Sequence, residues 1–123
     1  MTITLVGAPR TKKNSARLIT AGRSPRVLPS EAFEVYQDDC GWQLGQYKWL
    51  GIDYKANICC LYYMPTAGKV DLLNLLSATM DILTHYGVIV DDNSRIAAGH
   101  DGSRVLYDKE RPRVEIKIER MEG

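Results

Sequence analysis

Four aspartates lie in the segment 69–92, whose sequence is KVDLLNLLSATMDILTHYGVIVDD. Asp71 stands near its start, Asp81 in its middle, and Asp91 and Asp92 close it as a pair. Carboxylate oxygens are the ligands that hard cations such as Mg²⁺ prefer, and a bound Mg²⁺ activates water for hydrolysis. The segment is therefore predicted to carry a metal-dependent hydrolytic site, with an ordinary helix bearing a solvated acidic face as the alternative.

The elements of this segment must position those acids. Apolar residues recur with the period of an amphipathic helix that starts near Asp71 and ends at Tyr86-Gly87, where the glycine suits a left-handed cap. The β-branched run Val88–Val90 predicts a short strand after it. A return strand would bring the pair Asp91–Asp92 back beside the helix start. These three acids are therefore predicted to form one catalytic, metal-binding site.

Three further residues are predicted to support the site. Asn74, one turn beyond Asp71, would hold a ligand carboxylate or a metal-bound water, and Lys69 would contact the scissile phosphate. A solvated turn cation is the alternative for Lys69. Asp81 lies about 15 Å along the helix from Asp71, so it is not expected to share an ion with it. A structural ion pair with an arginine, or a bond to His85, explains Asp81 at least as well.

The N-terminal quarter of the chain is strongly basic. Residues 1–30 contain six lysines and arginines and no acid, so they carry +6, while the rest of the chain carries −5. Such a segment favours binding to a polyanion such as DNA, with a solvated basic loop as the alternative. The residues predicted to contact DNA are Arg10, Lys12, Lys13, Asn14, Arg17 and Arg23.

Length and composition indicate one ordinary domain over residues 1–123, large enough to bury a core without disulfides. No apolar run approaches the ~20 residues of a membrane span, and the N-terminus lacks the pattern of a signal peptide, so a cytoplasmic location is expected. Cys40, Cys59 and Cys60 are odd in number and form no C-x-x-C motif. They are predicted to be reduced, structural thiols.

The remaining patterns predict an α+β fold, in which two main helices pack on one face of a small mixed β-sheet. Alternation and turn residues predict how the rest of the chain is divided. The expected elements are a strand at 2–6, a long basic loop or loose hairpin at 7–29, a helix from Glu31 to about Gln46 capped by Ser30, a strand at 52–64, a turn at 65–68, an irregular strand or ribbon at 93–110 with a turn near Asp101-Gly102, and a strand at 113–120.

Several motifs together resemble the RusA-type Holliday junction resolvases (crossover junction endodeoxyribonucleases). They are D-L-x-N at 71–74, D-x-L at 81–83, G-V-I-V-D-D at 87–92, K-K-N-S at 12–15, and M-P at 64–65. The D-L-x-N motif alone would be weak, but its spacing to Asp81 and to the terminal acid pair makes the pattern fairly specific. The resemblance covers most of the chain.

The resemblance implies a homodimeric endonuclease, often encoded by phages or prophages, that acts in DNA recombination and repair. Such enzymes make paired nicks in four-way DNA junctions with Mg²⁺, or Mn²⁺ in its place. By position, Asp71 and Asp92 would be catalytic metal ligands, and Asp91 an acid in the same pocket. Leu73 and Met80, near the polar border of the helix, are candidates for a subunit contact, and core packing explains them equally well.

Two positions depart from the family pattern. Leu73 stands where a second acid is common, and Ser77 stands where a lysine is common. Three explanations are open: Asp81 or another acid substitutes, the chain uses a different ligand set, or it binds junctions and cuts poorly. The alternative function is therefore a non-catalytic or weakly catalytic junction-binding protein. A small dimeric scaffold with a regulatory role is a third hypothesis.

Overall fold

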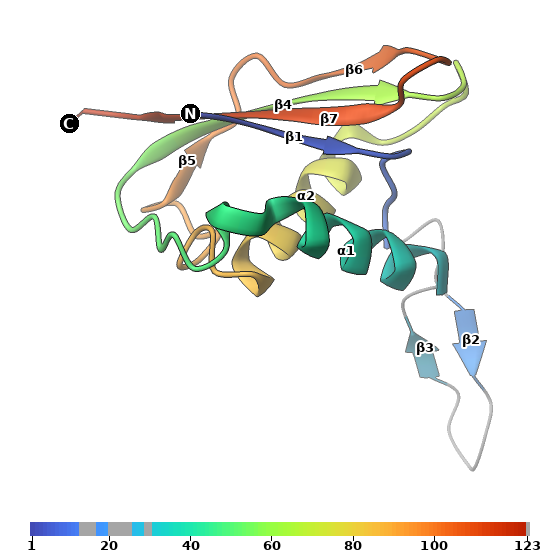
Figure 1. The fold of residues 1–123 in the computed structure, drawn as a ribbon, viewed down its shortest axis with the longest axis horizontal. Coiled ribbons are helices and arrows are strands. Elements are labelled where there is room, and N and C mark those ends of the chain that lie inside the picture. Colours follow the sequence, from blue (N-terminus) through green and yellow to red (C-terminus); the bar gives the residue numbers. More distant parts are fainter. Residues whose placement is uncertain (13–16, 20–25, 29–30, 123) are drawn as a thin grey trace.

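Figure 1 shows the central sheet of the molecule. Alternating residues of its strands are apolar and buried. The computed structural model describes residues 1–12, 17–19, 26–28 and 31–122. The strands of the sheet are β1 (Thr2–Val6), β4 (Ala56–Met64), β5 (Ala97–Gly99), β6 (Arg104–Tyr107) and β7 (Arg113–Arg120). β7 is antiparallel to both β1 and β4, whereas β5 and β6 pair with β4 in parallel. The sheet is therefore mixed, as the sequence predicts.

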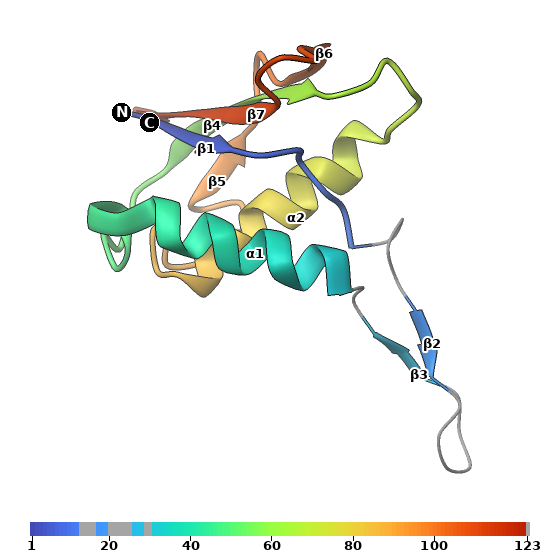
Figure 2. The ribbon, with the colours of Figure 1, turned by 45° about the vertical axis from the view of Figure 1, so that its right-hand side comes forward.

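Two helices lie on the same face of this sheet (Figures 1 and 2). They are α1 (Glu31–Leu44), which continues into the short 3-10 helix η2 (Gly45–Tyr47), and α2 (Leu72–His85). The α+β class with two helices on a small mixed sheet is confirmed. Neither helix in the described part of the chain is both long and apolar enough to cross a bilayer.

α1 agrees closely with its prediction. The helix begins at Glu31, its first turn holds two acids that suit the positive end of a helix dipole, and it ends two residues before the expected Gln46. Its predicted apolar positions Phe33, Tyr36, Cys40 and Leu44 are all buried. Ser30, the predicted cap, lies outside the described residues.

α2 follows its predicted bounds, and its end depends on one glycine. Gly87 has φ +70°, and a Cβ there would run into the ring of Trp49. Glycine is therefore required both by the left-handed cap and by the close approach of the tryptophan. The predicted polar face is partly wrong, because Ala78 is buried at 3% exposure. It borders a small hollow that Lys12 of the N-terminal segment also lines.

The strand predicted at 52–64 is shorter in the structure. β4 begins at Ala56, and its inward residues Ala56, Ile58, Cys60 and Tyr62 are buried as expected. Ile52 is also buried, but it belongs to an isolated parallel bridge with Ile89. The apolar alternation of the sequence therefore starts before β4 itself, because Ile52 packs into the core from an extended loop that precedes the strand.

The strand predicted at Val88–Val90 is wrong, because this run contributes only that single bridge. Ile52 donates to the Val88 carbonyl at 3.0 Å and accepts from the Val90 amide at 3.1 Å. Val88 and Ile89 are fully buried, while Val90 is exposed and leads into a loop. Packing of an irregular segment into the core, and not a strand, therefore accounts for the β-branched residues Val88 and Ile89.

The region 93–110 forms two short strands that line one edge of β4. β5 pairs near the start of β4 and β6 near its end, with the predicted turn at Asp101-Gly102 between them. Side chains bridge the gap: Asn57 accepts the Asp101 amide at 2.8 Å, and Ser103 accepts the Cys60 amide at 2.9 Å. The expectation of an irregular strand is therefore confirmed, and β5 and β6 do not pair with each other as a ribbon.

The remaining sequence predictions have simple outcomes. β7 spans the predicted 113–120, and the loose hairpin in the basic segment consists of β2 (Arg17–Ile19) paired with β3 (Arg26–Leu28). All three cysteines are free thiols. Burial raises the pKa of Cys40 to about 11 and that of Cys60 to about 12, so both stay protonated at neutral pH.

One buried hydrogen bond links β4 to α2 and gives a test of this packing. Tyr62 is fully buried, and its hydroxyl lies 2.7 Å from the hydroxyl of Thr79, which donates to the Leu75 carbonyl at 2.9 Å. Tyr62→Phe leaves the Thr79 oxygen without its donor, so the free energy of unfolding should fall by about 1 kcal/mol in urea denaturation. Tyr107→Phe, at a side chain that is 55% exposed, is the matched control and should change nothing. Equal effects from the two variants would contradict this account.

Candidate functional site

Asp71 lies at the start of α2 and caps the helix. Its backbone is extended, with φ −87° and ψ 115°, and its Oδ1 accepts the amides of Leu73 at 2.9 Å and Asn74 at 3.4 Å. A capping aspartate satisfies free amides and places negative charge at the positive end of the helix. The side chain is nevertheless exposed. Asp71 therefore has a structural role besides any role toward a metal ion.

Asp91 and Asp92 lie in the exposed loop that follows Val90. Asp91 accepts the Asp92 amide on Oδ1 at 2.7 Å and the Asn93 side-chain amide on Oδ2 at 3.2 Å. Asn93 in turn accepts the Arg95 amide at 2.9 Å. The bond between Asn93 and the Arg95 amide is typical of an Asx turn. Asp91 thus organises the loop, while Asp92 presents a carboxylate at the surface.

The length of α2 separates these two groups of acids. Asp71 precedes the helix, the pair follows it, and 14 residues of helix span about 21 Å. Asp71 comes just after the far end of β4, whereas residues 88–90 are bonded to Ile52, just before the start of β4. The prediction that a return strand brings Asp91–Asp92 beside Asp71 is therefore wrong within one chain. Val88–Val90 pairs at the helix end and does not run back along α2.

The described carboxylates of one chain do not gather into one cluster. Among the residues that the structure describes, no three His, Cys, Asp or Glu side chains lie close enough together to hold a metal ion. A Mg²⁺ ion needs several oxygen ligands in nearly octahedral geometry and commonly keeps some of its waters. Asp71 and the pair Asp91–Asp92 are thus two separate groups of exposed carboxylates.

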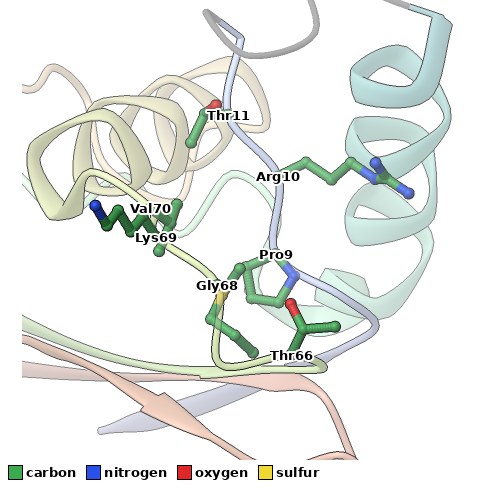
Figure 3. Close-up of a pocket in the computed structure, with 8 residues that line it drawn as sticks. Pro9, Arg10, Thr11, Thr66, Gly68, Lys69 and Val70 are labelled. Atoms are coloured by element: carbon green, nitrogen blue, oxygen red, sulfur yellow. The ribbon is translucent and has the colours of Figure 1, made fainter.

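Lys69 lies beside Asp71, as predicted, at the rim of a cavity of about 200 Å³. Arg10 and Thr11 from the N-terminal segment line the same cavity, opposite Thr66 of the turn after β4 (Figure 3). The charged ends of Arg10 and Lys69 point away from each other. Arg10 and Lys69, which are far apart in the sequence, therefore both lie near the start of α2. Their side chains point in different directions.

Asp81 pairs with a lysine of the basic segment. The Lys12 Nζ lies 2.7 Å from the Asp81 Oδ2, and both side chains are roughly two-fifths exposed, at 43% and 39%. The predicted structural ion pair is thus present, with Lys12 as the partner in place of an arginine or His85. Asn74 and Ser77 line a hollow beside Lys12. The residues Asp71, Asn74, Ser77 and Asp81, spaced three or four apart on α2, are called the polar stripe below.

The contact between Lys12 and Asp81 was missed by reasoning from the sequence, because the two residues are 69 positions apart. Both residues were noted separately, but nothing in local spacing pairs them. The other predicted DNA-binding residues give less information. Lys13, Asn14 and Arg23 lie outside the described residues, and Arg17 lies in β2, where only the backbone is described.

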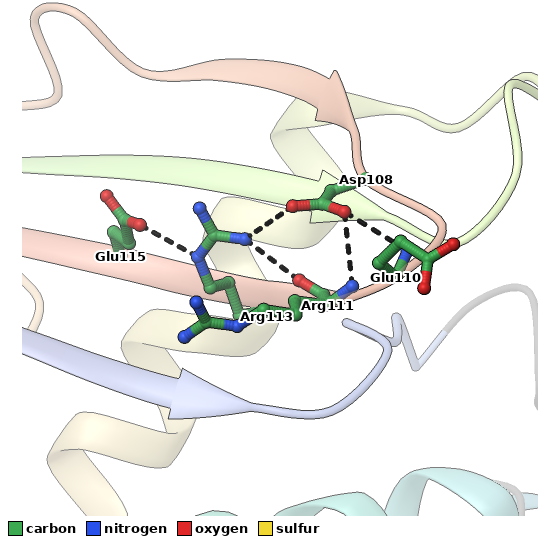
Figure 4. A network of polar contacts seen from close by, with 5 residues as sticks. All are labelled: Asp108, Glu110, Arg111, Arg113 and Glu115. Carbon is green, nitrogen blue, oxygen red and sulfur yellow. Dashed lines mark hydrogen bonds and ion pairs between the residues drawn. The ribbon is translucent and has the colours of Figure 1, made fainter.

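The densest charged network lies elsewhere, at the start of β7 (Figure 4). Arg113 donates to Asp108 at 2.9 Å and to Glu115 at 2.8 Å, and its guanidinium lies 3.8 Å from the centre of the Tyr63 ring. The hydrogen bond from Arg113 is the main reason that the pKa of Asp108 is lowered. Asp108 also accepts the amides of the turn at 110–111. These partners satisfy one another, so the network is structural.

Comparison with known proteins does not assign the chain to a family. No protein-family model matches the chain, and no curated protein matches it. The resemblance in the motifs therefore stays a hypothesis that must be argued from the residues.

The two possible roles of Asp71 can be separated by substitution. Asp71→Ala removes the cap and should lower the free energy of unfolding by about 1 kcal/mol, whereas Asp71→Asn keeps an acceptor oxygen and should be nearly neutral. Urea denaturation measures both, with Asp92→Ala as the control at an exposed loop carboxylate. A loss from Asp71→Asn as large as that from Asp71→Ala would mean that the charge, and not the cap, stabilises the helix.

Proposed function

We propose that this protein is a metal-dependent endodeoxyribonuclease that resolves four-way DNA junctions, as a homodimer of the RusA type. The observation that supports it best is the ion pair between Lys12 and Asp81, which places a lysine of the N-terminal segment against the helix that Asp71 caps. A cation that could bind a phosphate thus lies against the helix that begins at an exposed carboxylate. Hydrolysis of a phosphodiester needs both kinds of group.

The separation of the acids supports a dimer in this proposal. A two-fold axis that sets the α2 helices of two copies antiparallel would place Asp71 of one chain near Asp92 of the partner subunit. Two such composite sites would form, as paired nicks require. Leu73 is 74% exposed and is available to a subunit contact, whereas Met80 is 4% exposed and is already used by the core of its own chain.

Each metal ion would be held by Asp71 of one chain and Asp92 of the partner subunit, with Asp91 as the adjacent acid of the same site that also shapes the loop. Mg²⁺, or Mn²⁺ in its place, supplies a Lewis acid and an activated water. Asn74 is one turn from Asp71, where its carboxamide orients a carboxylate or a bound water. Lys69 contributes positive charge next to the scissile phosphate. A role in DNA recombination and repair in the cytoplasm, for a phage or a bacterial host, follows from this activity.

A junction-binding protein without cleavage is the alternative function. Leu73 and Ser77 on α2 favour it, because neither offers the charge that the family pattern has there. The third hypothesis, a small dimeric scaffold with a regulatory role, involves no contact between the protein and DNA. It requires that replacing Lys12 and Lys13 with alanine leaves DNA affinity unchanged.

The enzyme hypothesis predicts Mg²⁺-dependent nicking of a synthetic four-way junction. Asp71→Asn and Asp92→Asn should each abolish nicking while the proteins stay folded and bind DNA, because each removes a charged metal ligand. Glu119→Gln is the matched control, because it removes one carboxylate from an exposed position of β7. It should leave the rate of nicking unchanged. Full activity in excess EDTA would contradict metal dependence, and junction binding without nicking in any metal would establish the alternative.

The composite site predicts that inactive variants complement each other. In a mixture of Asp71→Asn and Asp92→Asn chains, each mixed dimer would contain one intact site and one site with both substitutions. Single nicks should therefore reappear on a denaturing gel, although either variant alone is inactive. If mixed dimers form, as two different tags would show, and no nicks appear, each site must be built from one chain.

A further inference from the structure

Lys12 is held in place by both helices at once. Its ammonium group pairs with Asp81 of α2 at 2.7 Å, and it lies 5.6 Å from the centre of the Phe33 ring of α1. Phe33 is buried, so the ring is a fixed platform for the cation. The Lys12 side chain is still 43% exposed. The charge is therefore fixed in position and open to a ligand.

The hollow beside this ammonium is lined by three residues that carry hydrogen-bond donors, although most of its surface is apolar. It has a volume of about 120 Å³ and is lined by Lys12, Asn74, Ser77 and Ala78. Lysine, asparagine and serine each supply hydrogen-bond donors, and the alanine adds no acceptor side chain. Asp81 is the one acid bonded to Lys12 in the described structure, and the lysine offsets its charge.

We propose that this hollow is a subsite for one phosphodiester group, with Lys12 as the phosphate-binding residue and Asp81 as a positioning residue. The identity of the ligand as DNA rests on the function proposed above. The ammonium group has three hydrogen-bond donors, so Lys12 can bond the Asp81 carboxylate and a phosphate oxygen at the same time. Asn74 and Ser77 then donate to the same phosphate group.

This subsite gives the basic segment a defined register on α2. Phosphate contacts fix the register and orientation of a protein on DNA, and a lysine that contacts both helices would place one phosphate at a set point along the polar stripe. Asp71 begins the same stripe, two turns before Ser77. The subsite therefore orients the DNA strand relative to the carboxylate that caps the helix.

Salt dependence of DNA binding separates this role from that of a structural ion pair. The affinity for a labelled four-way junction is measured by fluorescence anisotropy in EDTA across a series of salt concentrations. The neutral double change Lys12→Ala with Asp81→Asn keeps the net charge of the pair at zero. If Lys12 contacts a phosphate, the slope of log K against log salt should still fall by about 1. If the pair is only structural, the slope should equal that of the unchanged protein.

A lysine placed at another position of the same hollow should restore the DNA binding that Lys12→Ala removes. Ser77 lines the same hollow and precedes Asp81 by four residues, so Ser77→Lys in the Lys12→Ala background can pair with Asp81 and occupy the hollow. It should restore both the slope and the affinity. Lys117→Ala, which removes one cation from an exposed position of β7, is the control for charge alone and should leave the slope unchanged.

Each outcome has one meaning. A reduced slope in the double variant, together with rescue by Ser77→Lys, supports the subsite. An unchanged slope in the double variant, or a loss of equal size from Lys117→Ala, overturns it while leaving the endonuclease hypothesis intact. No junction binding by the unchanged protein overturns both. Circular dichroism melting of every variant shows that the compared proteins are folded.

Discussion

The burial of the apolar face of α2 against the sheet is the constraint on which the candidate site depends. Tyr62 of β4 and Thr79 of α2 share a hydrogen bond inside this interface, and Leu75, Ile82 and Leu83 are fully or almost fully buried. β4, α2 and β5 form a parallel β-α-β unit, so the helix must run back against the direction of β4. The cap residue Asp71 and the loop acids therefore end up at opposite ends of α2.

This arrangement assigns different tasks to acids that look equivalent in the sequence. Asp71 satisfies the first amides of a helix, Asp91 organises a turn, and Asp81 pairs with a lysine. Each carboxylate has a local partner that would be present without any metal ion. One chain leaves Asp71 and Asp92 at opposite ends of α2, so they do not share one site within it.

Lys12, from the N-terminal segment, lies against the polar side of α2. Ala78 lies on the side of the helix that an isolated amphipathic helix would expose to water, yet it is buried, and it borders the hollow that Lys12 lines. Lys12 contacts both helices, one through an ion pair and the other through an aromatic ring. The basic segment is thereby attached through Lys12 to α2, whose one acid between Leu72 and His85 is Asp81.

Local patterns were sufficient to predict much of this protein. The periods of apolar residues predicted α1, α2 and β7 almost to the residue, and Gly87 predicted the end of α2, because helix caps and strand alternation depend on near neighbours in the chain. The same reasoning extended β4 too early and made Val88–Val90 a strand, because an apolar run is compatible with any buried conformation. Tertiary structure alone decided that Lys12 meets Asp81 and that Asp91–Asp92 lies far from Asp71. Both results follow from packing between residues distant in sequence, which no local spacing records.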